Sequence, residues 1–434
     1  KYANEPFTLI DHPLTIVILP ESSINELKDV SPEIASFRNF LYVYWHGRYS
    51  YIGQYSHATE SAVKTGMNRD VNTQLVTLAD ETRFAIPKML PACEDGWEEI
   101  QLSTVLTKVV AYVTFRSFVG LPLSREDAWI EATTNYATTL SKFSAAVRES
   151  HWSLRWLARP VHWFRTVRPH QQQFVGMLAP IVAAAKRAKQ DREQGLDAEP
   201  PRTLIEWMIS YNKMKDVSAS KITGAQLTAS FAAIHSTTGL VEHVLLDLAA
   251  RPDDAQALRD ELTEHAPDGN LDKVAISKLW KLDSFIKESQ RCNPATAFHM
   301  LRLTSSPLQI SPFPPIPANT NVAISAPGTS GITSYDNRDA FDGFRHARAR
   351  AAPDASNKHQ LVTTGPTATS FGHGPHACPG RYFAANEIKV LIAELLTRYD
   401  LKFAEGMERP RNMLLPGGAV FADPGAKVLF RGRK

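Results

Sequence analysis

Hydrophobic residues along this chain recur mostly at helical spacing, and the longest such segment covers residues 223–250. Its apolar side chains follow one another at intervals of three and four residues, as on one face of a helix. They are Leu227, Phe231, Ile234, Val241, Val244, Leu245 and Leu248. Arg251 and Pro252 end the segment, because proline cannot continue a helix. A helix of this length spans roughly 40 Å at about 1.5 Å per residue, which is enough to cross a domain.

The remaining pattern predicts shorter helices and a few short strands. Helical periodicity occurs at residues 22–30, 102–120, 173–190, 201–214 and 381–399. Short segments of the kind that form strands occur at residues 15–19, 308–310, 321–324 and 428–430. The pattern as a whole predicts a mainly α fold with small β-sheets.

Composition indicates one large globular domain. Hydrophobic residues make up 43% and charged residues 21% of the 434 residues, and no repeat, low-complexity tract or long linker interrupts them. We therefore expect a single domain over residues 1–434. A net charge of +3 is too small to indicate nucleic-acid binding.

Cysteine usage and hydropathy bear on the cellular location. The chain has three cysteines, Cys93, Cys292 and Cys378, which is an odd number and gives no disulfide framework. This usage favours a reducing, cytosol-facing location. No uninterrupted apolar stretch reaches the roughly 18 residues of a membrane span. Because the chain begins at Lys1 rather than Met, we expect residues to have been removed upstream.

Candidate chemistry concentrates at one cysteine, Cys378, within the ten residues FGHGPHACPG at 371–380. Glycines allow the main chain to turn tightly and to approach a ligand. The segment directly precedes the helix predicted at 381–399, and backbone N–H groups at a helix N-terminus stabilise a thiolate. A cysteine thiolate in such surroundings suits haem iron, because this axial ligand favours cleavage of the O–O bond. The alternative is a buried structural cysteine in a loop rich in glycine and proline.

The same ten residues resemble the haem-binding signature of the cytochrome P450 monooxygenases, F-x-x-G-x-[RH]-x-C-x-G, with every fixed position filled. The resemblance implies the cytochrome P450 fold, with one large haem-binding domain and a haem b cofactor whose iron is ligated by Cys378. It places Phe371, His376 and Gly380 at cofactor-binding positions, with His376 beside a propionate. Arg302 matches an arginine that the family uses at the propionates. The family's W-x-x-x-R pattern is not recognisable within residues 70–85.

A second group of residues resembles the structural Glu-Arg-Arg triad of the family. Glu288 and Arg291 lie three residues apart on a predicted helix, and therefore on one face of it. Alone, this spacing indicates only a solvated ion pair. The segment FDGFR that ends at Arg345 resembles the one that completes the triad. The resemblance implies that Glu288, Arg291 and Arg345 support the loop before the cysteine, without taking part in the chemistry.

Two threonines midway along the longest helix are the candidate catalytic residues. Thr237 and Thr238 fall where the family pattern [AG]-G-x-[DE]-T-[TS] has its hydroxyl residues. Splitting dioxygen requires protons in a site that excludes water, and a hydroxyl that holds a water suits that task. The alternative is that both hydroxyls bond back to carbonyls of the preceding turn. The chain departs from the pattern at Ile234, in place of glycine, and at Ser236, in place of the acid, so the proton source is left open.

Nearly the whole chain resembles fungal members of the family. Segments 230–235, 281–285 and 376–381 resemble enzymes of fungal secondary metabolism, in the group that contains the ent-kaurene oxidases. Such relatives imply O2 as co-substrate and an NADPH-cytochrome reductase as electron donor. They also imply attachment to the cytosolic face of the endoplasmic reticulum membrane through an N-terminal anchor that this chain lacks.

We expect the substrate to be a mid-sized apolar metabolite, either a terpenoid or an alkaloid of the indole or diketopiperazine type. The expected lining residues are Phe231, Ala233, Phe298 and Val420. Other uses of the same haem stay open: radical C–C or C–N coupling, ring formation, or a reductase-independent reaction. A haem-binding sensor or carrier is a further alternative, and it would show no turnover with any reductase.

Overall fold

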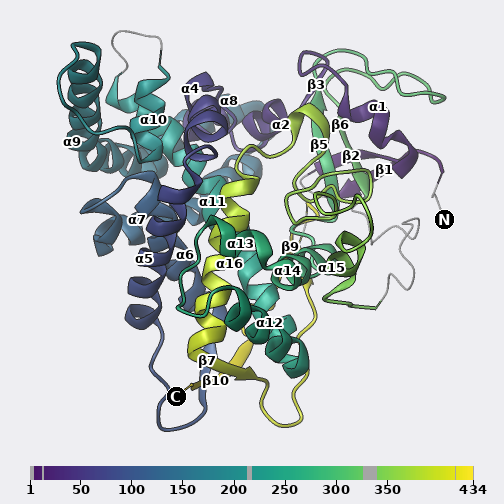
Figure 1. The fold of residues 1–434 in the computed structure, drawn as a ribbon. Helices are drawn as coiled ribbons and strands as arrows, with labels where there is room; N and C mark the ends of the chain where they lie inside the picture. The colour runs from purple at the N-terminus through teal and green to yellow at the C-terminus, as the bar shows by residue number, and fades with distance from the viewer. Residues whose placement is uncertain (1–3, 12–13, 213–217, 326–339, 416, 434) are drawn as a thin grey trace. The chain divides into compact units, whose positions relative to one another are not determined.

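The computed structural model describes residues 4–11, 14–212, 218–325, 340–415 and 417–433. The chain divides into two compact units, and each is described by itself (Figure 1). The first unit contains residues 1–40, 86–106 and 236–434, and the second contains residues 41–85 and 107–235. Helices α2 (Phe37–Tyr44), α5 (Val71–Met89), α6 (Leu102–Phe118) and α11 (Ala219–Ala249) contribute residues to both units.

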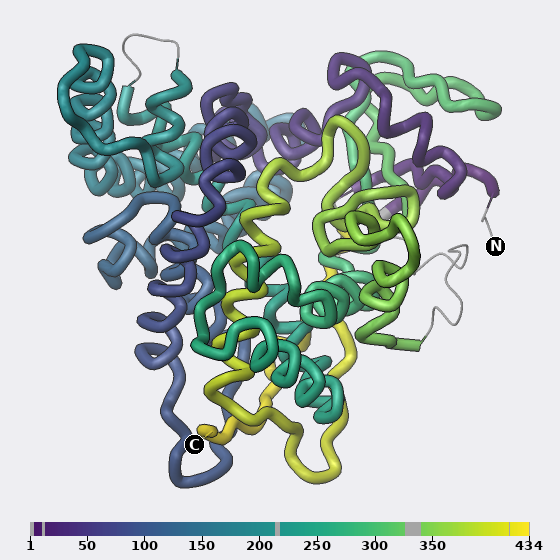
Figure 2. Tube along the Cα trace, in the orientation of Figure 1, coloured from purple at the N-terminus to yellow at the C-terminus, as the bar shows by residue number. Residues whose placement is uncertain are grey.

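A five-stranded sheet in the first unit has the order β1-β2-β6-β5-β3. Its strands are β1 (Phe7–Asp11), β2 (Leu14–Leu19), β3 (Ala35–Ser36), β5 (Phe298–Thr304) and β6 (Asn321–Ser325). Strands β2 and β6 pair in parallel, with Ile16 opposite Asn321, and the other pairs are antiparallel. Figure 2 shows the chain between β5 and β6 doubling back as a two-limbed arm. Its Leu308 and Ile310 join a buried cluster with residues of β2, β6 and α1 (Ile24–Lys28).

The helical part of the first unit carries the cysteine loop. Its helices are α12 (Pro252–His265), α13 (Lys273–Lys278), α14 (Trp280–Cys292), α15 (Arg345–Arg350) and α16 (Arg381–Arg398). Helix α12 contacts both α14 and α16, and α14 also contacts α15 (Figure 1). A three-stranded sheet has the order β4 (Glu98–Gln101), β10 (Lys427–Gly432), β7 (Tyr399–Lys402), and β8 (Met413–Leu414) forms a hairpin with β9 (Val420–Phe421).

The second unit is helical among its described residues. Its elements are α3 (Gly47–Ser50), α4 (His57–Ser61), α7 (Asp127–Glu149), α8 (Arg155–His162), α9 (Arg168–Glu193) and α10 (Leu204–Ser210). Edge-on aromatic contacts join Trp129 to Phe115 and to Phe174 in its core. The fully buried carboxylate of Glu81 accepts hydrogen bonds of 2.9–3.2 Å from Arg125. This pair holds α5 to the turn that precedes α7.

The predicted fold class, mainly α with small β-sheets, is confirmed. The longest predicted helix corresponds to α11, and those at 102–120, 173–190 and 381–399 correspond to α6, α9 and α16. The strand predicted at 308–310 is wrong, because the structure has only an isolated bridge between Leu308 and Ile316 there. Prolines fill much of the segment 312–317, and proline has no N–H to donate to a sheet.

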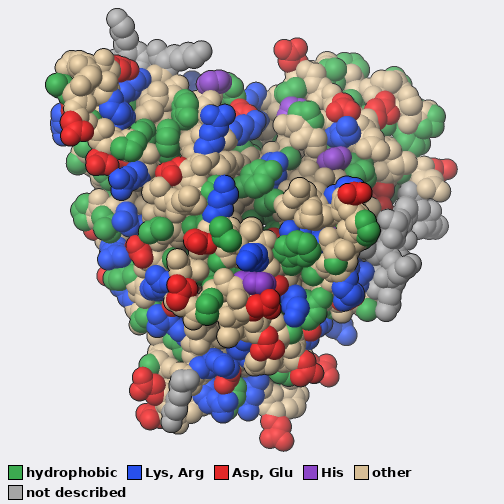
Figure 3. Space-filling model, viewed as in Figure 1, with side chains coloured by type: hydrophobic (Ala, Val, Ile, Leu, Met, Phe, Trp, Pro, Cys, Tyr) green, Lys and Arg blue, Asp and Glu red, His purple; other side chains and the backbone are tan. Residues whose placement is uncertain are grey.

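Two general features frame the site. Within the described ranges, no helix is both long and apolar enough to cross a bilayer. Lys and Arg side chains are interspersed with Asp and Glu across the face drawn in Figure 3, rather than gathered into a field of one sign.

Candidate haem-thiolate site

The cysteine loop is a compact turn between the segment 361–371 and helix α16. The Cys378 N–H donates to the Phe371 carbonyl at 2.7 Å, which closes the loop on itself. Gly372 and Gly374 have φ values of +71° and +75°, and only glycine adopts this left-handed region without strain. These two glycines therefore bend the chain so that Cys378 lies directly before the first turn of α16.

Cys378 combines accessibility with desolvation. Its side chain is solvent-accessible, yet the surrounding protein raises the pKa of its thiol. This combination describes a thiol that faces open space within a recess. Hydrogen bonds from the backbone N–H groups of Gly380 and Arg381 to the sulfur act in the opposite direction and lower the pKa. The N-terminus of α16 is therefore arranged to stabilise a thiolate at Cys378.

Other residues of the first unit fit the carboxylates of a haem group. Arg302 on β5 is buried, and among the described residues its guanidinium meets only the carbonyls of Val30 and Ala35, each at 3.5 Å. Burial lowers the pKa of Arg302, which shows that its charge is poorly solvated. An anionic ligand would compensate this buried charge. His376 lies exposed in the short 3₁₀ turn Gly374–His376. Apart from its chain neighbours, no atom of the described residues would lie within 4 Å of a Cβ added at Gly380, so the space beside this residue is open.

The structure brings Glu288, Arg291 and Arg345 together. Glu288 on α14 is fully buried, and Arg291 donates to its two carboxylate oxygens at 2.7 and 2.9 Å. Arg345, the first residue of α15, places Nε 3.1 Å from Glu288 Oε1. Burial raises the pKa of Glu288, but hydrogen bonds from Arg291 and His346 have the larger effect and bring the pKa down to about 2. The carboxylate therefore stays charged and joins α14 to α15.

Two partners of Glu288 were missed by the sequence prediction. His346 lies with Nε2 at 3.5 Å from Glu288 Oε2, and the backbone N–H of Asp342 donates to Oε1 at 3.1 Å. Both residues stand next to or near Arg345 in the chain. No sequence motif predicts that the Asp342 backbone or the His346 ring contacts Glu288, so these contacts are identified only in the folded structure.

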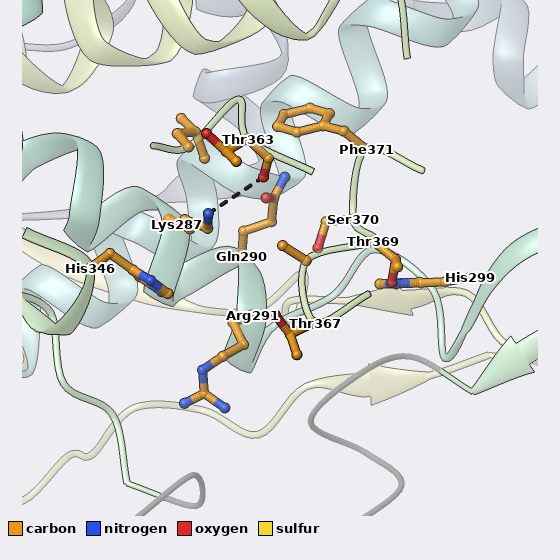
Figure 4. A pocket seen from close by; sticks show the side chains of 12 residues that line it. Lys287, Gln290, Arg291, His299, His346, Thr363, Thr367, Thr369, Ser370 and Phe371 are labelled. Carbon is orange, nitrogen blue, oxygen red and sulfur yellow. Dashed lines mark hydrogen bonds between the residues drawn. The ribbon is translucent and has the colours of Figure 1, made fainter. Parts of the chain in front are cut away.

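Helix α14 also anchors the segment that leads into the cysteine loop. Lys287 donates to the Gln360 carbonyl at 2.8 Å, and Asp283 accepts from the Leu361 N–H at 2.7 Å while pairing with Lys389 of α16. Figure 4 shows a small cavity at this junction, between α14 and residues 361–371, with His299 reaching in from β5. His299 contacts the Thr369 hydroxyl at 2.6 Å. The loop before Cys378 is thus attached to α14, α16 and the sheet.

The hydroxyls of Thr237 and Thr238 differ from those of Thr228 and Ser230 on the same helix. Thr228 and Ser230 donate to the carbonyls four residues earlier, at 2.9 Å each. Neither Thr237 nor Thr238 makes such a bond within the part of the chain that is described, although both side chains are buried. Their hydroxyls are therefore available to a water molecule or a ligand.

A buried acid lies one turn beyond these threonines. Glu242 is four residues after Thr238 on α11, and one of its buried oxygens has no hydrogen-bond partner among the described residues. Burial and the charge of Asp423 raise its pKa to about 7. Sequence reasoning missed Glu242, because it lies outside the family pattern in which an acid is expected at Ser236.

The predicted substrate-lining residues are distributed over both units. In the first unit, Phe298 packs against the backbone of Gly418, where an added Cβ would lie 2.3 Å from the ring. Val420 follows two residues later and donates its N–H to the Ala295 carbonyl at 3.0 Å. The structure therefore brings the segments of Phe298 and Val420 together. Phe231 and Ala233 belong to the second unit, where the ring of Phe231 contacts Trp45 edge-on at 5.1 Å.

Comparison with known proteins identifies the class to which this fold and site belong. The sequence profile of the cytochrome P450 family matches residues 85–430. The chain is 34% identical to cytochrome P450 monooxygenase BOA7 of Botryotinia fuckeliana, over 95% of this chain and 82% of that protein. It is 35% identical to BOA4 of the same fungus, over 99% of this chain and 87% of that protein. It is 32% identical to cytochrome P450 monooxygenase gliF of Aspergillus fumigatus, over 100% of this chain and 88% of that protein.

The chain therefore belongs to the cytochrome P450 family and is a haem-dependent oxidoreductase. The relatives are fungal, as the sequence resemblance indicates. Its likeness to the group of the ent-kaurene oxidases stays a prediction.

The Glu288 network predicts a large loss of stability when the charge is removed. Glu288→Gln leaves the guanidinium groups of Arg291 and Arg345 buried without a carboxylate, which costs about 3–5 kcal/mol. Lys427→Met is the matched control, because it breaks an exposed pair with Glu99 (2.7 Å) whose contribution is at most about 1 kcal/mol. Urea unfolding of both variants measures the difference. Equal stability of the two variants would contradict the structural importance of Glu288.

Proposed function

We propose that this protein is a haem-thiolate monooxygenase that oxidises a mid-sized apolar secondary metabolite with O2. The substrate class is a terpenoid or an alkaloid of the indole or diketopiperazine type, the cofactor is haem b, and an NADPH-cytochrome reductase supplies the electrons. Three relatives described as monooxygenases support the reaction type. The observation that carries the proposal is the accessible Cys378 sulfur, which accepts hydrogen bonds from the backbone N–H groups of Gly380 and Arg381.

The residues of the cysteine loop hold and tune the cofactor in this proposal. Cys378 would ligate the haem iron, and Arg302 and His376 would pair with the propionates. A thiolate-bound haem supplies cleavage of the O–O bond and oxidation of an unactivated carbon. The hydrogen bonds to the sulfur moderate the charge that the thiolate donates, and the loop stays rigid because α14 and α16 hold it.

Thr237 and Thr238 hold protons near the reacting oxygen in this proposal. Their hydroxyls are spared from the helix backbone, so each is able to bind a water molecule and pass a proton along it. Apolar side chains at Phe298 and Val420 orient the substrate and exclude other water. Radical coupling or ring formation would use the same residues, and the products of a reconstituted reaction distinguish these outcomes from hydroxylation.

Replacing the proposed ligand tests the cofactor assignment. We expect Cys378→Ala to lose the carbon monoxide difference band for which the family is named, because the thiolate bond is gone. Cys93→Ala is the control, since Cys93 is a buried thiol beside β10 whose sulfur hydrogen bonds to the Pro91 carbonyl. Dithionite-reduced spectra with and without carbon monoxide measure the band. An unchanged band in Cys378→Ala would overturn the assignment, and the absence of haem from folded wild-type protein would overturn the proposed function.

Removing the Thr237 hydroxyl tests proton delivery. We expect Thr237→Ala to consume NADPH at nearly the normal rate while product formation falls by roughly 10²-fold and peroxide is released. Thr228→Ala is the control, because that hydroxyl lies on the same helix and bonds back to Gly224. Product and peroxide formed per NADPH are measured with a fungal reductase. Full coupling in Thr237→Ala would move the proton relay to other residues, and turnover without NADPH would indicate a reductase-independent enzyme.

We further propose that the protein works at the cytosolic face of the endoplasmic reticulum membrane, anchored by a segment upstream of this chain. An exposed segment of the second unit supports this location. Trp152, Trp156 and Phe164 are 75%, 70% and 59% exposed, and none of the residues of α8 is buried. The sequence of residues 150–170 contains four arginines and no acidic residue. Exposed aromatic rings with basic neighbours are typical of segments that lie in a membrane interface.

Vesicle binding tests the membrane contact. We expect the chain to sediment with vesicles of phosphatidylcholine and phosphatidylserine, and the double variant Trp152→Glu, Trp156→Glu to bind about tenfold more weakly. Val76→Glu is the control, because Val76 is an isolated exposed residue of α5 in the same unit. Equal vesicle binding by the wild type, the double variant and Val76→Glu would show that Trp152 and Trp156 do not contact the membrane.

A further inference from the structure

A buried polar cluster joins three separate segments of the first unit next to the predicted substrate-lining residues. Asp247 of α11, Ser289 of α14, Asn293, Arg409 and Asn412 form this cluster, which we call the Arg409 clasp. Asp247 is buried, and its Oδ1 accepts from Arg409 Nε at 2.5 Å. Its Oδ2 accepts from Ser289 at 2.6 Å and from Asn293 at 3.0 Å. One carboxylate therefore ties α11, the end of α14 and the chain before β8 together.

The guanidinium of Arg409 is the centre of the clasp. Besides Asp247, it donates to Asn293 Oδ1 at 2.9 Å and to Asn412 Oδ1 at 3.2 Å, and Asn412 donates in turn to Asn293 at 2.8 Å. Arg409 also contacts His243 Nδ1 at 3.2 Å. Burial, together with the charge of Arg409, lowers the pKa of His243 to about 4, so the ring is neutral and accepts this bond.

The two segments that leave the clasp pair with each other. Asn293 is followed by residues 295–298, and Asn412 is followed by the β8–β9 hairpin. The Ala297 N–H donates to Gly418 at 2.7 Å, and the Val420 N–H donates to Ala295 at 3.0 Å. Phe298 and Val420 therefore lie on paired segments. Arg409 binds Asn293 and Asn412, the residues from which these segments start.

Stability alone does not require this arrangement. A buried Arg–Asp pair often contributes less to stability than apolar residues of the same volume, because both charges lose their hydration. A planar guanidinium with several fixed donors does, however, define the relative position of the groups that it binds. The clasp is thus suited to orienting the segments that it joins.

We propose that Arg409 is a positioning residue for substrate specificity, which sets the placement of Phe298 and Val420 relative to α11. The inference rests on the proposed function, because it assumes that Phe298 and Val420 line the substrate cavity. Loss of the clasp changes the shape of the apolar lining and leaves the cysteine ligand intact. Regioselectivity and the fit of bulky ligands therefore depend on Arg409.

Binding of two iron ligands of different size tests this inference without turnover. Imidazole and 4-phenylimidazole share one ligating group, but only the second needs room for a phenyl ring. In Arg409→Met we expect the ratio of their dissociation constants to change by about tenfold, with the carbon monoxide band and the imidazole affinity unchanged. Arg409→Lys keeps the charge without the planar fork and should restore the ratio only in part.

Two further variants keep the test interpretable. Arg411→Met is the matched control, because Arg411 is exposed in the same segment and has no partner among the described residues. Asn412→Ala removes two bonds of the clasp but leaves the Arg409–Asp247 pair in place, and should change the ratio in the same direction if Arg409→Met does not fold. A ratio unchanged in Asn412→Ala and Arg409→Met overturns the positioning role. A wild-type protein without a thiolate-type band would instead overturn the proposed function.

Discussion

The buried carboxylate of Glu288 is the constraint on which the first unit depends. A fully buried charge is costly unless each of its oxygens is paired. Four groups meet that need: the guanidinium groups of Arg291 and Arg345, the ring of His346 and the backbone N–H of Asp342. Because these groups come from α14 and from residues 342–346 at the start of α15, the carboxylate fixes the two helices relative to each other.

That fixed pair of helices supports the cysteine loop indirectly. Helix α14 holds residues 360–361 through Lys287 and Asp283, and Asp283 also pairs with Lys389 of α16. In the chain, Cys378 lies between these two attachments, directly before the N-terminus of α16, whose backbone N–H groups hydrogen bond to its sulfur. The Glu288 ion pairs thus fix α14, α14 fixes the cysteine loop, and the loop fixes the direction of the Cys378 thiol.

Local patterns in the sequence predict much of this arrangement. The period of the apolar residues predicts α6, α9, α11 and α16 because each buries one face over several turns. The spacing of Glu288 and Arg291 predicts their contact because three residues separate them on one helix. The order of the five-stranded sheet, with β2 beside β6, pairs segments some 300 residues apart, and no local pattern encodes it.

Contacts between distant polar side chains were equally beyond sequence reasoning. Arg409 and Asp247 are 162 positions apart, and nothing in their immediate neighbours distinguishes them from surface residues. Glu242 lies close to the predicted threonines, but its significance comes from burial and from the charge of Asp423. Such residues gain their properties from the folded environment, which periodicity and motif spacing do not describe.

The contact between Phe298 and Gly418 has a consequence for how this protein can diversify. A methyl group at Gly418 would lie 2.3 Å from the Phe298 ring, and the residue has a φ of +82°. Larger side chains at this position therefore require a smaller residue at 298. A smaller residue at 298 relieves only the clash with the ring, because the left-handed backbone at 418 strains any side chain with a Cβ. New cavity shapes are therefore more accessible through changes at 298 with Gly418 kept.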